Sequence, residues 1–571
     1  MNTNLKKDSL NQNERLSSNI LPELPISKFD RSFTNKTTFD SGRLVPVMLD
    51  EILPGDSIEL NISALIRSVV PVAPIMDNAK FTLHAFFVPN RLVWDKWKAF
   101  MGESNNAWLD SGVDTIPYLD FTNADGSFLL ADDWYKAFGP SSLFAYLGIP
   151  IIYGENSYGD NDKQLPTKLN ALPIRAYVKI WNDWYRDQNL QDALLLDTSS
   201  NNVIYNSILK NKLENSGYGF ANSDNDWFMY DSGYWDLGVP YGLNLATVSK
   251  FADYFTSALP SPQRGDDTYL IDSIKKFNFN VDYSNYETVS NDNGSLGVTD
   301  ADVTGSDILS INELRYAISI QHFKELDARG GTRYIEIVKN HFGVESQDLR
   351  VQRAQFLGGV SQYIQIHQVN QTTPNDGNIT NVNQGLGSAG AQSITYVETQ
   401  NTIKSSFTEH GFLMVLCSVR PENTYAYGLE RLWTKYTKFD YFWPTFDNIG
   451  EQPIYQYEIM LNRENMESNA IFGYMPAWSD YRYKINRVSG YFSPKCRNSL
   501  VNWTYTTNYG YYTTDIPNQI VLNGDFIQQS QKNIAQTLTY QNMHQFIATF
   551  YFDYKHSRVM KVDSIPGIDR I

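Results

Sequence analysis

The sequence contains little cysteine and histidine, and this scarcity argues against most metal-dependent chemistry. Cys417 and Cys496 are the only cysteines among 571 residues, so no disulfide framework is expected, which fits a reducing compartment. Two cysteines cannot complete a thiolate site, and no two of the seven histidines have the spacing of a helical zinc motif. Unless distant residues assemble a site, we expect neither a metal nor a cofactor.

Long hydrophobic runs are missing as well. The longest run, residues 412–419, is interrupted by Ser418 and is far too short to span a bilayer. Residues 1–18 have no apolar core and therefore do not resemble a signal peptide. The sequence predicts a protein that is made in the cytoplasm and does not insert into a membrane.

Positive charge is scarce, because 47 basic residues are outnumbered by 63 acidic ones and the net charge is −16. A chain that wrapped nucleic acid by charge alone should be basic, since affinity comes from neutralising phosphates. Any contact with nucleic acid must then be local, assisted by aromatic rings, or shared with a separate basic partner. Aromatic residues are abundant instead, at 14% of the chain, which favours strands and large protein interfaces.

The distribution of apolar residues predicts a mainly β fold with strands near 33–90 and 406–571. Residues 410–420 are almost continuously apolar, as in a strand buried on both faces, and residues 545–555 alternate between apolar and polar. Residues 172–188 have the spacing of an amphipathic helix. One β-sandwich closed by its N- and C-terminal strands explains this pattern better than a string of separate domains.

The remaining segments are predicted to be additions to one domain over residues 31–571. Residues 1–30 are polar and are expected to form a mobile arm. Residues 189–245 and 266–309 lack sustained periodicity and are expected to be insertions, and residues 370–405 are expected to be a surface loop.

Residues 310–344 are predicted to form two short helices. Ser310 and Glu313 have the spacing of a capping box, and Gly330 and Gly331 separate the two helices. Two helices across such a joint fit either a helix-turn-helix DNA reader or ordinary packing. The strand-rich flanks and the acidic charge of the chain favour packing.

Signals for catalysis are weak. Gly385, Gly387 and Gly390 match G-x-G-x-x-G, but they follow a polar stretch rather than a strand and indicate a loop. Glu409 and His410 are neighbours on a predicted strand, so they point to opposite faces and structural use is favoured over acid–base catalysis. The sequence predicts no enzyme. A carbohydrate-binding or carbohydrate-active β-sandwich stays open as the alternative, because the separation of two carboxylates cannot be read from sequence.

Basic residues that lie beside aromatic ones are more suggestive. Such clusters combine phosphate-binding charge with rings that can stack on bases, although they also fit solvated strand ends or contacts between subunits. Two clusters occur in the C-terminal third, and two further arginines lie in the predicted helical segment. The residues predicted to face DNA or a neighbouring subunit are Arg329, Arg333, Arg482, Tyr483, Lys484, Arg487, Tyr554, Lys555 and Arg558.

Several longer stretches resemble one known family. LDARGGTRYIEIVKNHFGV (326–344), FTEHGFLMVLCSVR (407–420) and FGYMPAWSDYRYKINRVSG (472–490) are similar to the major capsid protein of the Microviridae, and most similar to its gokushovirus-type members. RSFTNKTTFDSGRLVPVMLDEILPGDS (31–57) and KFDYFWP (438–444) resemble the same family. The resemblance therefore extends from about residue 31 to the C-terminus.

The resemblance implies a single eight-stranded jelly roll with long helical and loop insertions, which self-assembles into a small T=1 icosahedral shell around circular single-stranded DNA. It also implies a protrusion at the threefold axes, for which residues 266–309 are preferred over residues 189–245. The implied partners are further copies of the chain, the packaged single-stranded DNA, a small basic DNA-packaging protein, an internal scaffolding protein and a receptor on the host cell surface. The implied location is the virion, after assembly in the cytoplasm of the host bacterium.

Overall fold

The computed structural model describes the strands at both ends of the chain and parts of the segments that connect them. The described residues are 25–73, 75–102, 115–120, 141–150, 168–194, 198, 204–205, 245–261, 352–370, 389–399, 401–447, 449–462, 466, 469–507, 520–539 and 544–562. The predictions for residues 266–309 and 310–344, with Arg329 and Arg333, lie outside this part of the chain. So does most of the predicted insertion 189–245.

The first of two large sheets has seven antiparallel strands. The long C-terminal strand β16 lies between β4 and the two N-terminal strands, and β4 pairs on its other side with β11 and β12. The strands of this sheet are β1 (Ser27–Asp30), β2 (Phe33–Phe39), β4 (Ser57–Ser68), β10 (Ile366–Asn370), β11 (Ala389–Glu398), β12 (Ile403–Ser406) and β16 (Phe546–Arg558).

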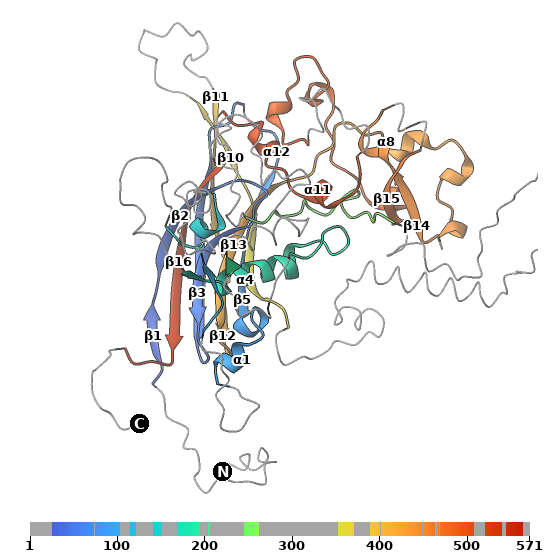
Figure 1. Cartoon of the computed structure of the whole chain (residues 1–571). Helices are drawn as coiled ribbons and strands as arrows, with labels where there is room; N and C mark the ends of the chain where they lie inside the picture. Colours follow the sequence, from blue (N-terminus) through green and yellow to red (C-terminus); the bar gives the residue numbers. More distant parts are fainter. Residues whose placement is uncertain are drawn as a thin grey trace, which may run out of the picture.

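The second sheet has four antiparallel strands in the order β3-β13-β5-β9. Their bounds are Val45–Ile52 for β3, Ala79–Pro89 for β5, Gln355–Tyr363 for β9 and Gly411–Pro421 for β13. Strands from the two ends of the chain pair in each sheet, β2 with β16 and β3 with β13, as in a double-sheet jelly roll. The predicted mainly β fold is confirmed (Figure 1), whereas the two large sheets hold seven and four strands in place of the eight of the predicted jelly roll.

The main core lies between the two sheets. Every second residue of β16 from Phe546 to Tyr554 is buried, which confirms the predicted alternation over residues 545–555. The ring of Phe550 lies 6.3 Å from the ring of Phe81 on β5, so aromatic side chains from the two sheets meet. Strand β13 is buried along nearly its whole length, as its continuous apolar sequence predicts, because a helix covers the outer face of its sheet.

This covering helix is α4 (Leu172–Ile180), which continues as the π-helix η3 (Trp181–Tyr185) and confirms the predicted helix over residues 172–188. The Tyr177 hydroxyl donates a hydrogen bond to the Leu44 carbonyl oxygen at 2.7 Å, and Trp181 Nε1 donates to the Thr247 carbonyl oxygen at 2.8 Å. These bonds satisfy buried polar groups and fix the helix against the second sheet.

Two predicted segments differ from the structure because β16 and β4 are each longer than the strands that pair with their outer edges. Residues 27–30, predicted to belong to the arm, form β1 and pair with Lys555–Arg558, beyond the residues that β2 covers. The predicted loop 370–405 contains β11 and β12, which pair in turn with residues 63–67 and 57–60 of β4. Backbone N–H and C=O groups along a long strand need partners, and short polar strands supply them here.

A second apolar core lies beside the sandwich, in a unit here called the lobe (residues 251–261, 422–492 and 520–527). Figure 1 shows it to the right of the two sheets. Strands were predicted throughout residues 406–571, but within the lobe the chain forms one strand pair and short helices around buried aromatic rings. The elements of the lobe are β14 (Glu451–Tyr455), β15 (Ile471–Pro476), α8 (Gln456–Ile459), α10 (Ser479–Arg482), α11 (Gly524–Ile527), η6 (Arg431–Thr434), η7 (Lys438–Asp440), η8 (Pro444–Phe446) and η9 (Gly490–Phe492).

The other described elements are short. They are η1 (Asn90–Leu92), α1 (Trp97–Phe100), α3 (Leu143–Tyr146), η10 (Val501–Trp503), α12 (Lys532–Ala535) and a small sheet of β6 (Tyr118–Asp120), β7 (Lys168–Asn170) and β8 (Ile204–Tyr205).

Candidate functional site

The lobe exposes a dense group of large apolar side chains, here called the aromatic surface. Trp433 and Tyr436 are 65% and 79% exposed, although residues of this kind usually lose most of their solvent contact on folding. Contiguous exposed apolar surface on a soluble protein marks a site of interaction. The aromatic surface consists of Leu432, Trp433, Tyr436, Phe439, Tyr441, Phe442 and Trp443.

The backbone beneath the aromatic surface is held by hydrogen bonds. The Asp440 carboxylate accepts from the backbone N–H groups of Tyr436 and Thr437 and from the Thr437 hydroxyl, at 2.7–3.0 Å, and these bonds lower the pKa of Asp440. Trp443 Nε1 donates to the Lys438 carbonyl oxygen at 2.7 Å. The exposed rings are therefore presented by a fixed turn and not by a loose loop.

Two ion pairs fasten this turn to the rest of the lobe. Arg431 lies 3.1 Å from Glu458, and both side chains are nearly buried. Lys435 lies 2.5 Å from Asp480, and its ammonium group lies 3.9 Å from the centre of the Tyr481 ring. A surface that is ordered before binding loses less conformational entropy when a partner covers it.

The sequence interpretation missed the aromatic surface as a functional feature. Residues 438–444 contributed to the family resemblance, but their exposure was not predicted. One sequence feature could have indicated this surface. Residues 432–443 contain seven large apolar residues, and their spacing matches neither the alternation of a strand nor the periodicity of a helix.

The structure brings two of the predicted basic residues together on one carboxylate. Lys484 and Arg487 each lie 2.6 Å from Glu430, and their hydrogen bonds lower the pKa of Glu430. Arg482 and Tyr483 are exposed beside them at the end of α10. Their predicted contact with DNA or a neighbouring subunit stays a prediction.

The predicted residues on β16 have different environments. Lys555 is exposed, whereas Tyr554 is 1% exposed and donates its hydroxyl hydrogen to Asp50 at 2.7 Å. Because its ring is buried, Tyr554 cannot stack on a base in this fold, and that part of the prediction needs correction. Arg558 is half-buried and donates from Nε to Asp56 at 3.1 Å, so much of its charge is already paired.

These contacts belong to a polar network, buried except at Arg31, that joins both ends of the described chain. One arrangement of protons satisfies its donors: His556 Nε2–H donates to Asp56 at 2.9 Å, while His556 Nδ1 accepts from Arg31 at 3.1 Å. Arg31 also makes two hydrogen bonds to Asp50, at 2.5 and 2.9 Å. The polar network comprises Arg31, Asp50, Asp56, Tyr554, His556 and Arg558.

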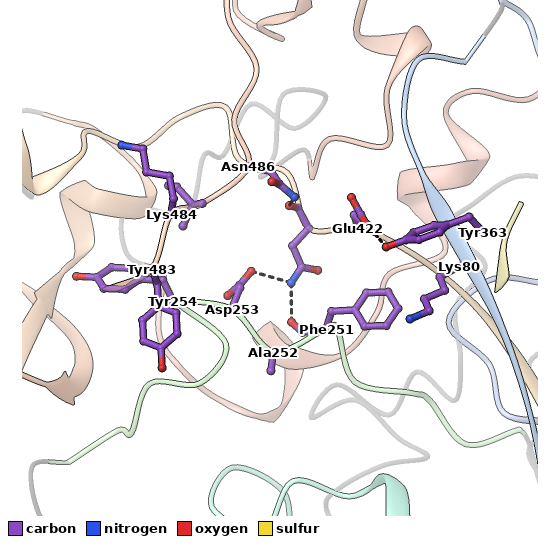
Figure 2. A pocket seen from close by; sticks show the side chains of 12 residues that line it. Lys80, Phe251, Ala252, Asp253, Tyr254, Tyr363, Glu422, Tyr483, Lys484 and Asn486 are labelled. Atoms are coloured by element: carbon purple, nitrogen blue, oxygen red, sulfur yellow. Dashed lines mark hydrogen bonds between the residues drawn. The ribbon is translucent and has the colours of Figure 1, made fainter. Parts of the chain in front are cut away.

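A pocket of about 310 Å³ lies between the second sheet and the lobe (Figure 2). The sheet contributes Lys80 and Tyr363, and the lobe contributes Phe251 and Asp253. Tyr483 and Lys484, two of the predicted residues, line its far side. The structure therefore places part of one predicted cluster at a concave surface.

Comparison with known proteins identifies the family. A family model described as "Capsid protein (F protein)" matches residues 19–135 and 154–568. The chain belongs to this capsid protein family. Three relatives match over almost their whole length, and each is named capsid protein VP1. That of Chlamydia phage 1 is 32% identical over 95% of this chain and 96% of the relative.

The other two relatives have similar identities. Capsid protein VP1 of Spiroplasma virus 4 is 30% identical over 96% of both chains, and that of Bdellovibrio phage phiMH2K is 32% identical over 95% of both. All three come from gokushovirus members of the Microviridae, so the resemblance seen in the sequence is confirmed.

In this capsid family member, the residues that resembled an acid–base pair have structural contacts. Glu409 accepts a hydrogen bond from Arg91 Nε at 2.6 Å, and the ring of His410 packs edge-on against Trp97. Within the described residues, no three His, Cys, Asp or Glu side chains are grouped to hold a metal ion. None of the helices in that part of the chain has the length and hydrophobicity needed to cross a bilayer.

Stability of the capsid subunit should fall as the pH drops below about 6.5, because the half-buried His84 and the buried His556 are held neutral. Desolvation, then the charge of Arg420, lowers the pKa of His84 from 6.5 to about 4, and desolvation together with Arg558 lowers the pKa of His556. At a pH between the folded-state and the unfolded-state pKa of a histidine, the unfolded chain binds more protons than the folded one. As the pH falls through this range, the free energy of unfolding decreases by up to about 1.4 kcal/mol per pH unit and per histidine.

Urea unfolding of the unassembled protein from about pH 7 to about pH 5 measures this slope. The variant His84→Gln should show a shallower pH dependence than the unchanged chain. An identical slope in both proteins would contradict the assignment to His84.

Proposed function

We propose that the chain is the major capsid protein of a small phage and that it self-assembles into a T=1 icosahedral shell enclosing circular single-stranded DNA. The observation that carries the proposal is the fixed aromatic surface on the lobe, which lies beside the β-sandwich. Interfaces that repeat by symmetry rely on buried aromatic anchors, and each weak contact is multiplied in a closed shell. Membership of the capsid protein family supports the same conclusion.

The net charge of −16 bears on the partners. An acidic shell does not neutralise a packaged genome, so a small basic packaging protein supplies the positive charge. An internal scaffolding protein directs assembly in the host cytoplasm, and surface insertions of the finished virion contact a receptor on the bacterial cell. The inner-surface contacts of the chain itself are few and depend on stacking.

Expression of the full chain with its scaffolding partner, followed by sedimentation and negative-stain microscopy, tests the proposal. We expect closed particles of one size. A chain that stays monomeric in the presence of the scaffolding partner, or that hydrolyses glycans, would overturn the proposal in favour of the carbohydrate alternative.

A further inference from the structure

Strand β1 lies at an edge of the first sheet and buries little of itself there. Its residues Ser27–Asp30 pair with the end of β16, and within the described part of the chain no second strand pairs with it. Phe29, which lies opposite His556 in this register, is only half-buried. Lys28 and Asp30 are exposed. A short edge strand with so few buried side chains is expected to open at a lower free energy than the core strands.

Arg31, which directly follows β1, holds the end of this strand on the sandwich. Its backbone N–H donates to the Tyr554 carbonyl oxygen at 2.8 Å, and its guanidinium group lies 5.5 Å from the centre of the Tyr554 ring. The same guanidinium group donates twice to Asp50 on β3, at 2.5 and 2.9 Å, and once to His556 Nδ1, at 3.1 Å. Arg31 therefore joins the end of β1 to both β3 and β16.

The hydrogen bond from Arg31 to His556 requires a neutral imidazole. His556 Nε2–H donates to Asp56 at 2.9 Å, so Nδ1 keeps the lone pair that accepts from Arg31. A proton on Nδ1 converts this acceptor into a donor and places a positive ring 3.1 Å from a guanidinium nitrogen of Arg31. The new N–H has another acceptor, because the Tyr554 hydroxyl oxygen lies 2.9 Å from Nδ1. Protonation thus replaces attraction by repulsion at Arg31, while the ring itself keeps hydrogen-bond partners.

The other charged groups that face the His556 ring leave no spare negative charge for this proton. Asp56, in the β3–β4 turn, lies 2.9 Å from Nε2, and Asp50 lies 3.7 Å from Nδ1. Arg558, on β16, lies 3.2 Å from Nε2. Arg558 and Arg31 balance the two carboxylates, so a proton on the ring adds an uncompensated charge to a largely buried group of side chains. Moving Arg31 out toward solvent relieves that charge.

We propose that protonation of His556 releases β1 from β16 while the two sheets stay folded. The charged ring displaces Arg31, and the end of β1 then loses its connection to β3. The pairing of β16 with β4 does not involve Arg31 and persists. The ion pair between Lys28 and Glu59 does not respond to mild acid, because hydrogen bonds from Lys28 and Lys404 lower the pKa of Glu59 to about 2. The N-terminal strand is therefore an acid-sensitive element of this sandwich.

Hydrogen–deuterium exchange of the unassembled full-length chain, between about pH 7 and about pH 5.5, tests the release once the intrinsic pH dependence of exchange is removed. At each pH, residues 27–31 should be less protected than β5. Burial and Arg558 lower the pKa of His556 in the paired state, so the protection of residues 27–31 should fall by up to about tenfold per pH unit below about 6.5. Equal protection of β1 and β5 would show that β1 opens only when the whole sandwich unfolds, and it would overturn the proposal.

Two histidine variants form a matched pair for the same measurement. The side-chain amide of His556→Gln can donate to Asp56 and accept from Arg31 but takes up no proton in this range, so the protection of β1 should no longer change with pH. His84 is the other histidine with a lowered pKa, and its ring lies 2.8 Å from the Tyr185 hydroxyl against the second sheet. His84→Gln should therefore leave the pH dependence of β1 intact. A pH dependence that persists in His556→Gln, or that disappears in His84→Gln, would overturn the proposal.

Arg31→Gln tests the connection itself at neutral pH. The variant loses the paired hydrogen bonds between the guanidinium group and Asp50, which are strong because both partners are charged. Protection of residues 27–30 should then fall at least about tenfold at about pH 7, while the urea midpoint shows that the sandwich is folded. Unchanged protection of β1 in Arg31→Gln would contradict the proposed role of Arg31. The result does not depend on whether the chain forms shells.

Discussion

Replacing Trp433 with aspartate should abolish particle formation and leave the subunit folded. The Trp433 side chain is 65% exposed, so the folded monomer loses little packing, and its free energy of unfolding should change by no more than about 0.5 kcal/mol. In a subunit interface the same change places an unpaired charge where a large ring should be buried. Hot-spot tryptophans at the centre of an interface commonly cost more than about 2 kcal/mol when truncated.

Repetition explains why the expected effect is so large. Every subunit of a symmetric shell carries the same defect, so a modest loss for each contact prevents closure of the whole particle. Sedimentation should show particles for the unchanged chain and slow-sedimenting subunits for Trp433→Asp. Trp433→Phe, which retains an aromatic ring, should restore part of the particle yield. Normal yields from Trp433→Asp would remove the aromatic surface from the assembly interface.

The sandwich was predictable because its strands have one-dimensional signals. Residues 410–420 are almost continuously apolar, a pattern that corresponds to a strand covered on both faces. Residues 545–555 alternate between apolar and polar, a pattern that corresponds to a strand covered on one face. The polar strands β1 and β12 have no such signal. They pair because β16 and β4 have backbone N–H and C=O groups that β2 and β11 do not reach. Their pairing therefore depends on the lengths of other strands and not on their own sequence.

The candidate sites were harder to predict for a different reason. An aromatic ring serves equally well in a core and in an interface, so the sequence of residues 432–443 does not tell whether Trp433 points inward or outward. The pairing of Lys484 with Glu430 brings together residues that lie far apart in the chain. In the same way, the buried Tyr554 hydroxyl finds its acceptor in Asp50, which lies near the other end of the sequence.

Removing the Asp56 carboxylate should be among the most destabilising single changes in the sandwich. Asp56 is completely buried and accepts hydrogen bonds from the Leu53 backbone N–H and from two side chains of β16, His556 and Arg558. In Asp56→Ala these donors are left without their acceptor. Breaking a buried charged pair in this way typically costs about 3–5 kcal/mol, so we expect a loss of that size in the free energy of unfolding.

Glu59, which lies on β4 three residues after Asp56, provides the matched control. It forms ion pairs with Lys28 and Lys404, but all three side chains are exposed to solvent. Exposed pairs are screened and contribute little, so Glu59→Gln should leave the urea midpoint nearly unchanged. Asp56→Asn keeps the shape of the side chain and one acceptor oxygen. Its urea midpoint should therefore lie between those of Asp56→Ala and Glu59→Gln. A midpoint for Asp56→Asn equal to that of Glu59→Gln would show that the polar network does not hold β16 to the β3–β4 turn.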